Sequence, residues 1–569
     1  MARIVMTIAL ALMLETAALA QAGAAANGER ETLAASVDQL FAQWDKPDTP
    51  GCALAVIKDG DIVYRRGYGA ANLELSVPLT PASVFNVGSI AKQFTAMSIL
   101  MLEQQGKLSL DDAIRKYLPE VPDFGTPITL RHLMQHTSGL RDLLEMREMA
   151  GWRIGDLTTE KDVLDMVSRQ RTLNHPPGEE FLYTNTGYVL LAVVVKRVAG
   201  QSLREFAEAN IFKPLGMNST HFYDSHRAII KGLVDGYVPH ESGFLKWMPA
   251  DDHIGSSNLY TTVEDLARWD KNFYDGRVGG AALLELMLTP GTLNDGFRLE
   301  YAHGLYVTSY KGLKTVVHNG SSLGYQGTLH RYPEQRFSVA LLCNVRGNNP
   351  DALARRVADL YLAEQFKQTA TASRSDTTLA PPQTVKLSEQ ELSRVAGLYW
   401  NPVADTVRRV YLKEGKLMYF RAPGNESELA PLGDNRFLML GARNRVEISF
   451  KSPRPGAPLQ MFFSEAGSRP SVQETVPPAS YEPRQLNEFA GTYYSPELDT
   501  TYTLTPDKDR LLLRTGNWGD FLLSPRFVDS FANPQEMGSI VFTRDEKKRV
   551  SGFVIRSGKV RNLRFDKTR

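Results

Sequence analysis

A serine and a lysine stand three residues apart in the stretch Phe85-Asn86-Val87-Gly88-Ser89-Ile90-Ala91-Lys92-Gln93-Phe94. No proline or glycine follows until Gly106, which predicts a helix that begins at or next to Ser89 and ends at Gly106. Residues three apart share a helical face, so the Lys92 amine can reach the Ser89 hydroxyl. The helix N-terminus adds partial positive charge near an alkoxide formed there. Ser-x-x-Lys alone also fits a solvated serine and lysine, so the chemical interpretation depends on partners elsewhere in the chain.

Length and composition limit which classes of protein this chain can belong to. The chain has 569 residues, too many for one core, which indicates roughly two to four domains. With 43% hydrophobic and 23% charged residues, the composition is that of an ordinary soluble globular protein. The net charge of +1 gives no electrostatic case for nucleic acid or an anionic membrane as a partner.

The N-terminus has the pattern of a secretory signal peptide. Arg3 precedes an apolar run from Ile4 to Leu14, and Ala18-Leu19-Ala20 supplies small residues for cleavage after Ala20. The run is shorter than the roughly 20 apolar residues that a membrane span needs. We therefore expect residues 1–20 to be a cleaved signal peptide, with export to a periplasm or the exterior and no stable membrane insertion.

Two cysteines are too few for a disulfide scaffold. Cys52 opens the apolar run that ends at Ile57, and Cys343 closes the run that begins at Phe337. If these two strands pair antiparallel, the thiols can meet. Separate buried thiols are the usual case, so the sequence leaves a bridge open.

His132 and His136 have the i,i+4 spacing of a helical metal site. No glutamate follows His132 and no third ligand is apparent, so packed or hydrogen-bonded histidines on a helix that ends at Gly139 are the favoured interpretation. We expect neither a metal nor another cofactor.

A second cluster is Tyr183-Thr184-Asn185, on a turn before the apolar helix expected over 189–198. Two side chains at this spacing can point into one pocket. A tyrosine beside an ammonium group can act as a phenolate base, because the positive charge lowers its pKa. Alone, the same pattern fits a turn with a buried tyrosine.

A third cluster, His318-Asn319-Gly320-Ser321, ends a β-run that starts near Thr315. Two further strands are expected over Tyr325–Arg331 and Phe337–Cys343, which would complete an antiparallel sheet. A closing helix is expected over Asp351–Phe366.

In this order and spacing, the three clusters resemble the serine β-lactamase and penicillin-recognising superfamily. The resemblance is closest to the branch of class C β-lactamases, D-aminopeptidases, D-alanyl-D-alanine carboxypeptidases and related esterases. Further segments of this branch are His136-Thr-Ser-Gly-Leu140, Pro177-Gly178 and Phe212-Lys-Pro-Leu-Gly-Met217. The resemblance implies an α/β (α+β) catalytic domain over residues 30–366, with an antiparallel sheet flanked by helices.

The resemblance also implies three catalytic residues. Ser89 would be acylated, while Lys92 and Tyr183 would share the removal of its proton and the later activation of water. The backbone amides of Ser89 and Ser321 would form an oxyanion hole, in which each donor is worth on the order of 3 kcal/mol.

The other implied residues bind substrate. Asn185 would hydrogen-bond the substrate or orient Lys92, and Gly320 and Ser321 would border the bound substrate. His318 would line the pocket opposite Tyr183, where many relatives carry a lysine suited to a substrate carboxylate. A histidine there is neutral or only partly charged near neutral pH, which disfavours efficient β-lactam hydrolysis and favours a D-aminopeptidase, an amidase or an esterase.

The C-terminal third contains an internal repeat. A Thr/Ser/Ala/Pro-rich linker is expected over residues 367–388. Beyond it, Val395-Ala-Gly-Leu-Tyr399-Trp-Asn-Pro-Val-Ala-Asp405 matches Phe489-Ala-Gly-Thr-Tyr493-Tyr-Ser-Pro-Glu-Leu-Asp499, an offset of 94 residues. The alternating pattern predicts two all-β barrels, over 389–475 and 487–569, with a linker at 476–486.

Similar lipocalin-like β-domains follow the catalytic domain in D-aminopeptidases of the family. We expect the two barrels to shape the active-site entrance or an oligomer interface; a ligand-binding role is the alternative.

The leading functional prediction is an exported serine hydrolase that works through an acyl-enzyme, a D-aminopeptidase-like peptidase or amidase on peptides with D-residues. An esterase, a weak β-lactamase or a D,D-carboxypeptidase would use the same catalytic set. A non-catalytic peptidoglycan- or peptide-binding protein is disfavoured by the intact Ser-Lys-Tyr set. The expected partner is a small peptide, amide or ester substrate, and a homo-oligomer is compatible with the sequence.

Overall fold

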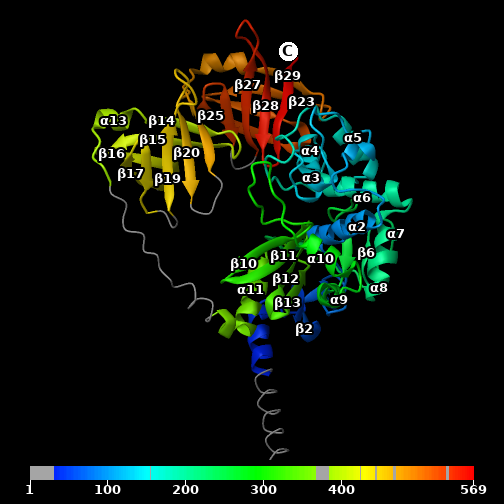
Figure 1. Cartoon of the computed structure of the whole chain (residues 1–569). Coiled ribbons are helices and arrows are strands. Elements are labelled where there is room, and N and C mark those ends of the chain that lie inside the picture. The colour runs from blue at the N-terminus through cyan, green and yellow to red at the C-terminus, as the bar shows by residue number, and fades with distance from the viewer. Residues whose placement is uncertain are drawn as a thin grey trace, which may run out of the picture.

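The computed structural model describes residues 31–153, 155–366, 384–422, 425–441, 445–465, 470–533 and 537–569. The predicted signal peptide and residues 367–383 of the predicted linker lie outside the described residues. Figure 1 shows an α/β part built on a sheet and two β-barrels formed by the C-terminal third. This is the fold class that the sequence predicts.

The α/β part is built on a six-stranded antiparallel sheet of order β10-β11-β12-β13-β1-β2. Its strands are β1 (Cys52–Lys58), β2 (Asp61–Tyr68), β10 (Tyr306–Tyr310), β11 (Leu313–Ser322), β12 (Tyr325–Tyr332) and β13 (Phe337–Cys343). Alternate residues of β1 enter different cores: Ala53, Ala55 and Ile57 join one apolar cluster, whereas Cys52, Leu54 and Val56 join another. Helices therefore cover both faces of the sheet, as the period-two alternation of a strand requires.

Helices and short strands fill out this part. The helices are α2 (Lys92–Gln104), α3 (Leu130–Met134), α4 (Leu143–Met149), α5 (Glu160–Ser168), α6 (Asn185–Ala199), α7 (Leu203–Ala207), α8 (Lys213–Leu215), α9 (Val263–Asp275), α10 (Gly280–Met287) and α11 (Pro350–Tyr361), with a further helix over 31–41. The short strands are β3 (Ala70–Asn72), β4 (Val77–Pro78), β5 (Phe85–Asn86), β6 (His221–Phe222), β7 (Tyr237–His240), β8 (Gly243–Lys246) and β9 (Leu259–Thr261). No helix of the described residues is long and apolar enough to cross a membrane.

Two helix boundaries near the predicted site differ from the sequence-based expectation, and α11 ends at Tyr361 rather than at Phe366. α3 ends at Met134 rather than at Gly139, because His136 takes a left-handed backbone conformation with φ of 57°. α6 begins at Asn185 rather than at 189, because the Thr184 side chain caps the helix by accepting from the Thr186 N–H. This earlier start places Asn185 on the first turn of a rigid helix.

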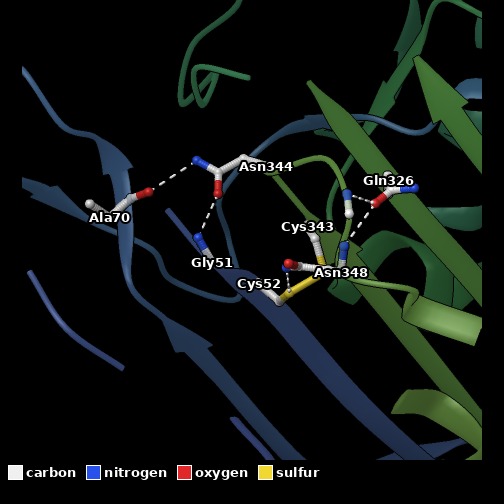
Figure 2. Close-up of a disulfide and its surroundings, with 8 residues drawn as sticks. Gly51, Cys52, Ala70, Gln326, Cys343, Asn344 and Asn348 are labelled. Carbon is white, nitrogen blue, oxygen red and sulfur yellow. Dashed lines mark hydrogen bonds between the residues drawn. A yellow bond between two sulfur atoms is a disulfide. The ribbon is translucent and has the colours of Figure 1, made fainter. Parts of the chain in front are cut away.

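Cys52 and Cys343 form a disulfide, which decides the question that the sequence leaves open (Figure 2). β1 and β13 pair antiparallel with these two residues directly opposite each other. The two sulfur atoms are therefore held together by strands that are separated by 291 positions in the chain. Nearby, Asn344 receives a hydrogen bond from the Gly51 N–H and donates one to the Ala70 carbonyl, which fixes the end of the sheet.

The C-terminal third folds into two closed eight-stranded barrels. The first contains β14 (Gly397–Asn401), β15 (Thr406–Lys413), β16 (Lys416–Ala422), β17 (Asn425–Gly433), β18 (Arg436–Met439), β19 (Val446–Lys451), β20 (Gln460–Glu465) and β21 (Ser471–Val476), preceded by α13 (Glu389–Ser393). The second contains β22 (Gly491–Ser495), β23 (Thr500–Asp507), β24 (Arg510–Arg514), β25 (Asp520–Phe527), β26 (Ser530–Asn533), β27 (Gly538–Arg544), β28 (Val550–Ser557) and β29 (Val560–Lys567). The domain bounds given above stay predictions.

Equivalent hydrogen bonds bear out the repeat. Tyr399 donates its hydroxyl to the Val395 carbonyl at 2.8 Å, and Tyr493 donates to the Phe489 carbonyl at 2.7 Å. All four residues keep the 94-residue offset seen in the sequence. The two barrels thus contain the same tyrosine-to-carbonyl hydrogen bond at equivalent positions, before and within their first strands.

Among the described residues, the second barrel shares its core with the catalytic part and the first does not. Its apolar residues belong to the same buried cluster as α2 and α6, whereas the first barrel has a separate core. Arg141, fully buried, forms an ion pair with Glu497 at 2.6 Å across this junction. Tyr502 adds a hydrogen bond to the Met149 carbonyl at 2.6 Å. The second barrel is therefore docked firmly beside the segments that carry the predicted site.

Candidate active site

Two glycines let the turn that carries Ser89 pack against β11. Ser89 lies in a short 3-10 turn (Gly88–Ala91) that leads into α2. Gly88 has φ of +51°, and a Cβ there would lie 2.5 Å from the Ser321 nitrogen. A Cβ on Gly320 would lie 1.9 Å from the Val87 carbonyl oxygen. Only glycine fits at either position, and the resulting close approach brings the Ser89 and Ser321 backbones together.

Lys92 is the central side chain of the site. Its Nζ lies 3.0 Å from Ser89 Oγ, 3.0 Å from Asn185 Oδ1 and 2.8 Å from the Ser256 carbonyl oxygen. The side chain is fully buried, and this burial lowers the pKa of Lys92 well below its usual value. The charge of Asp142 opposes the effect, and that of Lys559 reinforces it. The amine is therefore available in its neutral form.

Asp142 orients Asn185. The Asp142 carboxylate accepts both the backbone N–H and the side-chain Nδ2–H of Asn185. With Nδ2 engaged, Oδ1 of Asn185 faces Lys92 and accepts from it. The same aspartate caps α4 by accepting from the Leu144 N–H, so one residue fixes both a helix end and the orientation of the amide.

Tyr183 lies on the other side of the Lys92 amine, whose nitrogen is 4.9 Å from the centre of its ring. Burial raises the pKa of Tyr183 well above its usual value, and the Ser89 side chain only partly offsets this. The hydroxyl has no hydrogen-bond partner among the described residues. The phenol is therefore protonated in the resting site, which argues against the phenolate base expected from the sequence and favours a proton donor.

His318 is held as a neutral imidazole. Its Nδ1 lies 2.7 Å from the Asn319 carbonyl oxygen, so Nδ1 carries the hydrogen and Nε2 can accept from the Tyr301 hydroxyl at 3.1 Å. Burial, with a smaller contribution from Lys92, lowers the pKa of His318 to about 3. This wall of the site thus carries a ring without positive charge.

These groups meet at a cavity of about 1070 Å³. Its lining includes the predicted residues Ser89, Tyr183, Asn185, His318, Gly320 and Ser321. Lys92 does not line the cavity but lies directly beneath Ser89. The structure thus brings together all seven residues predicted from the sequence.

Sequence reasoning missed four groups of this site: Asp142, the Ser256 carbonyl, Tyr301 and Lys559. Asp142 precedes an apolar helix and carries the signal of an N-cap, but a cap does not indicate contact with Lys92. A backbone carbonyl such as that of Ser256 leaves no mark in the sequence. Lys559 lies in the second barrel, at the turn between β28 and β29, and only tertiary packing brings it to the cavity.

The histidine pair has a structural role. His132 accepts a hydrogen bond from the Thr129 N–H at the start of α3, and His136 is buried with its ring 4.1 Å from that of Tyr183, measured between centroids. Among the described residues, no group of three or more His, Cys, Asp or Glu side chains is arranged to hold a metal ion.

Serine, buried amine and paired backbone amides together define the class of a serine hydrolase, and comparison with known proteins agrees. The Beta-lactamase family model matches residues 37–364. Penicillin-binding protein 4* of Bacillus subtilis (strain 168) is 32% identical over 452 residues, which cover 75% of this chain and 96% of that protein. The D-aminopeptidase of Gluconobacter oxydans (strain 621H) is 30% identical over 298 residues, 52% of this chain and 56% of that protein.

A solved structure shares the fold. The octameric penicillin-binding protein homologue from Pyrococcus abyssi superposes with a TM-score of 0.52 at 24% identity, over 78% of this chain and 99% of that chain. The chain belongs to the β-lactamase family and is a serine hydrolase.

Proposed function

We propose that this protein is an exported D-aminopeptidase-like peptidase or amidase that cleaves peptides and amides with D-residues through an acyl-enzyme on Ser89. The proposal places the acyl chemistry on Ser89, Lys92 and Tyr183, with Asn185, His318, Gly320 and Ser321 around the substrate.

One observation carries the proposal: the hydrogen bonds of Lys92 suit an amine that takes a proton from Ser89. Asn185 Oδ1 and the Ser256 carbonyl oxygen can only accept hydrogen bonds. A neutral amine has two N–H donors, which these oxygens occupy, and one lone pair. That lone pair is left for the Ser89 hydroxyl, 3.0 Å away. Lys92 is thus set as the general base for acylation.

Acylation follows from this arrangement. Ser89 Oγ forms a bond to the substrate carbonyl carbon while its proton passes to Lys92 Nζ. The backbone amides of Ser89 and Ser321 stabilise the oxyanion of the tetrahedral intermediate. The C–N bond then breaks, and the departing amine takes a proton from the Tyr183 hydroxyl, which Lys92 restores. In deacylation, water gives a proton to the neutral Lys92 amine as its oxygen bonds to the acyl carbon. The bond from that carbon to Ser89 Oγ then breaks, Oγ takes the proton from Lys92, and the acid leaves.

The substrate class rests on His318 and on the relatives. A neutral imidazole on the wall opposite Tyr183 offers no fixed charge to a substrate carboxylate, unlike a lysine. A relative with 30% identity is a D-aminopeptidase. An amide leaving group also needs a proton donor, which the protonated Tyr183 provides.

Export is supported by the disulfide. Disulfides persist in oxidising compartments such as a periplasm or the exterior and are rare in reducing cytosol. The signal-like residues 1–20 agree with this, and detection of a mature chain that starts at Gln21 would test it. Homo-oligomerisation stays a prediction, which the mass of the purified protein in solution would check.

A fluorophosphonate probe and a chiral substrate pair test the catalytic proposal. Mass spectrometry should find one adduct, on Ser89, and D-alanine p-nitroanilide should be hydrolysed faster than its L-enantiomer. Ser89→Ala should abolish labelling and turnover with an unchanged unfolding temperature. Ser98→Ala, a buried serine on α2 outside the cavity, is the matched control and should keep both. A labelled Ser89→Ala protein, or no D-amide turnover by the wild type, would refute the proposal.

A further inference from the structure

The turn between β28 and β29 of the second barrel reaches the catalytic cavity. Lys559, at this turn, lines the same cavity as Ser89 and Tyr183. Its Nζ lies 5.2 Å from the centre of the Tyr183 ring. Figure 1 shows β28 and β29 side by side, with the ends of the barrel strands directed toward the α/β part. A residue 376 positions after Tyr183 therefore forms part of the site.

The backbone of this turn is fixed to the catalytic part on two sides. The Lys559 N–H donates to the Glu145 carboxylate at 2.6 Å. Asn174 donates its Nδ2–H to the Lys559 carbonyl at 2.8 Å and accepts the Arg561 N–H at 2.7 Å. Its side-chain amide thus pairs with the backbone of β29 in the way that the backbone of an adjacent strand does. These bonds hold the position of Lys559 without using its side chain.

Glycine at the tip permits this contact. Gly558 has φ of +49°, and a Cβ there would lie 2.7 Å from a carboxylate oxygen of Glu145. Arg561, next on the strand, binds Glu180 through two hydrogen bonds of 2.9 Å. The turn is thus held in place at its tip and on its flank.

Among the described residues, no carboxylate forms a salt bridge with the ammonium group of Lys559, although the charge of Glu145 acts on it from farther away. Its side chain is half-buried, and its Nζ lies over the face of the Tyr183 ring. Two other cations of the cavity wall differ from it: Arg147 is paired with Asp251, and the Arg346 guanidinium lies over the Trp247 ring. An unpaired cation in a partly desolvated wall has a strong preference for an anion.

Burial disfavours positive charge on the two nearest basic groups of the site. It lowers the pKa of Lys92 well below its usual value and that of His318 to about 3. Lys559 contributes to lowering the pKa of Lys92 and of His136, which shows that its charge acts on the catalytic groups. Lys559 is therefore a cation of the cavity wall that lies within electrostatic reach of the predicted catalytic groups.

We propose that Lys559 is a specificity residue that binds a carboxylate of the substrate. The inference rests on the proposed acyl-enzyme function and adds that, among substrates with D-residues, those that carry an anionic group are preferred. The carboxylate has two sources: the C-terminus of the departing residue, or an acidic group on the acylating residue.

Matched substrate pairs test this proposal and separate the two sources. The first pair is N-acetyl-D-alanyl-D-alanine and its C-terminal amide, which differ in the charge of the leaving group. The second pair is N-succinyl- and N-acetyl-D-alanine p-nitroanilide, which differ in the charge of the acylating part. A charge-assisted hydrogen bond corresponds to about a ten- to hundredfold preference in kcat/KM for the anionic member of one pair.

Three variants assign the preference to Lys559. Lys559→Met keeps the length of the side chain and removes its charge. It should bring the ratio of kcat/KM between the anionic and the neutral substrate close to one, and Lys559→Arg should retain the preference. Lys547→Met removes an exposed lysine from the turn between β27 and β28, at the other end of the barrel, and should leave the ratio unchanged.

A binding measurement keeps this inference separate from the catalytic proposal. Calorimetry of Ser89→Ala with N-acetyl-D-alanyl-D-alanine and N-succinyl-D-alaninamide needs no turnover, and adding Lys559→Met should weaken binding of one of them about ten- to hundredfold. Equal selectivity or affinity with and without the Lys559 charge would overturn the inference even if Ser89 is acylated. Absent labelling of Ser89 with intact carboxylate binding would instead overturn the catalytic proposal alone.

Discussion

Asn185 donates two hydrogen bonds to one oxygen of Asp142, from its backbone N–H at 2.6 Å and from its Nδ2–H at 3.0 Å. This pairing leaves Asn185 Oδ1 facing Lys92. It also places a buried negative charge close enough to raise the pKa of Lys92 against the lowering effect of burial. Asp142 thus orients Asn185 and acts on the charge of Lys92, two residues of the predicted site.

Asp142→Asn should shift the acidic limb of the kcat/KM–pH profile to lower pH. The limb reports protonation of Lys92, and loss of the Asp142 charge removes the interaction that favours the ammonium form. The plateau should fall about tenfold, the effect of one weakened charge-assisted hydrogen bond. Asp162→Asn, at the cap of α5, is the control and should shift neither limb nor plateau. An acidic limb that moves to higher pH would contradict this assignment.

Tyr183→Phe should slow amide cleavage more than ester cleavage. Burial keeps the phenol protonated, so its role is to protonate a departing amine. Loss of this acid should cost roughly 10²- to 10⁴-fold in kcat on a peptide amide, and much less on a p-nitrophenyl ester, whose leaving group needs no proton.

The unfolding temperature of Tyr183→Phe should equal that of the wild type or be slightly higher, because the hydroxyl has no hydrogen-bond partner among the described residues. Tyr494→Phe, an exposed tyrosine of the second barrel, provides the matched control and should leave both rates unchanged. Equal losses on amide and ester would show that Tyr183 has a role other than protonation of the leaving group.

Removal of the disulfide should destabilise the α/β part. The bridge closes a loop between residues separated by 291 positions, which restricts the unfolded chain, and its loss should cost about 3–5 kcal/mol. The Cys52→Ala/Cys343→Ala variant should therefore show a lower denaturant midpoint than the oxidised wild type. Reduced wild type should behave like the variant. Coincident unfolding curves for oxidised and reduced protein would refute this prediction.

Glu145→Gln should stabilise the protein at high pH. Burial, followed by the charge of Asp142, raises the pKa of Glu145 from 4.5 to about 7. A carboxyl group with a raised folded-state pKa contributes stability below pH 4.5 that is lost as pH rises to about 7. At pH 8 the glutamine, which can still accept the Lys559 N–H, should therefore be more stable by roughly 2–3 kcal/mol.

The difference between Glu145→Gln and the wild type should shrink toward zero as pH falls to 4.5. Denaturant unfolding at pH 5 and pH 8 measures it, with Glu148→Gln as the control on the exposed side of the same helix. A pH-independent difference would mean that Glu145 titrates normally.

Local sequence patterns were sufficient to predict most of the proposed catalytic residues. Ser89 and Lys92 are three residues apart on one helical turn, so their contact is a local property of the chain, and the structure gives it as 3.0 Å. The barrel repeat was also readable, because matching residues recur at a constant offset. Helix boundaries were less predictable: the left-handed φ of His136 depends on packing around a buried imidazole, which no propensity records.

By itself, the sequence determined the predicted nucleophile and its lysine, the order of the three motifs and the two barrels, because these appear as short spacings and as a repeat. Only the tertiary structure decided that Cys52 meets Cys343, that Tyr183 is a buried protonated phenol, and that Lys559 enters the cavity. Strand register, desolvation and domain docking each depend on many residues that are far apart in the chain. The helical turn that carries Ser89 and Lys92 was therefore predictable, whereas the position of Lys559 in the cavity wall was not.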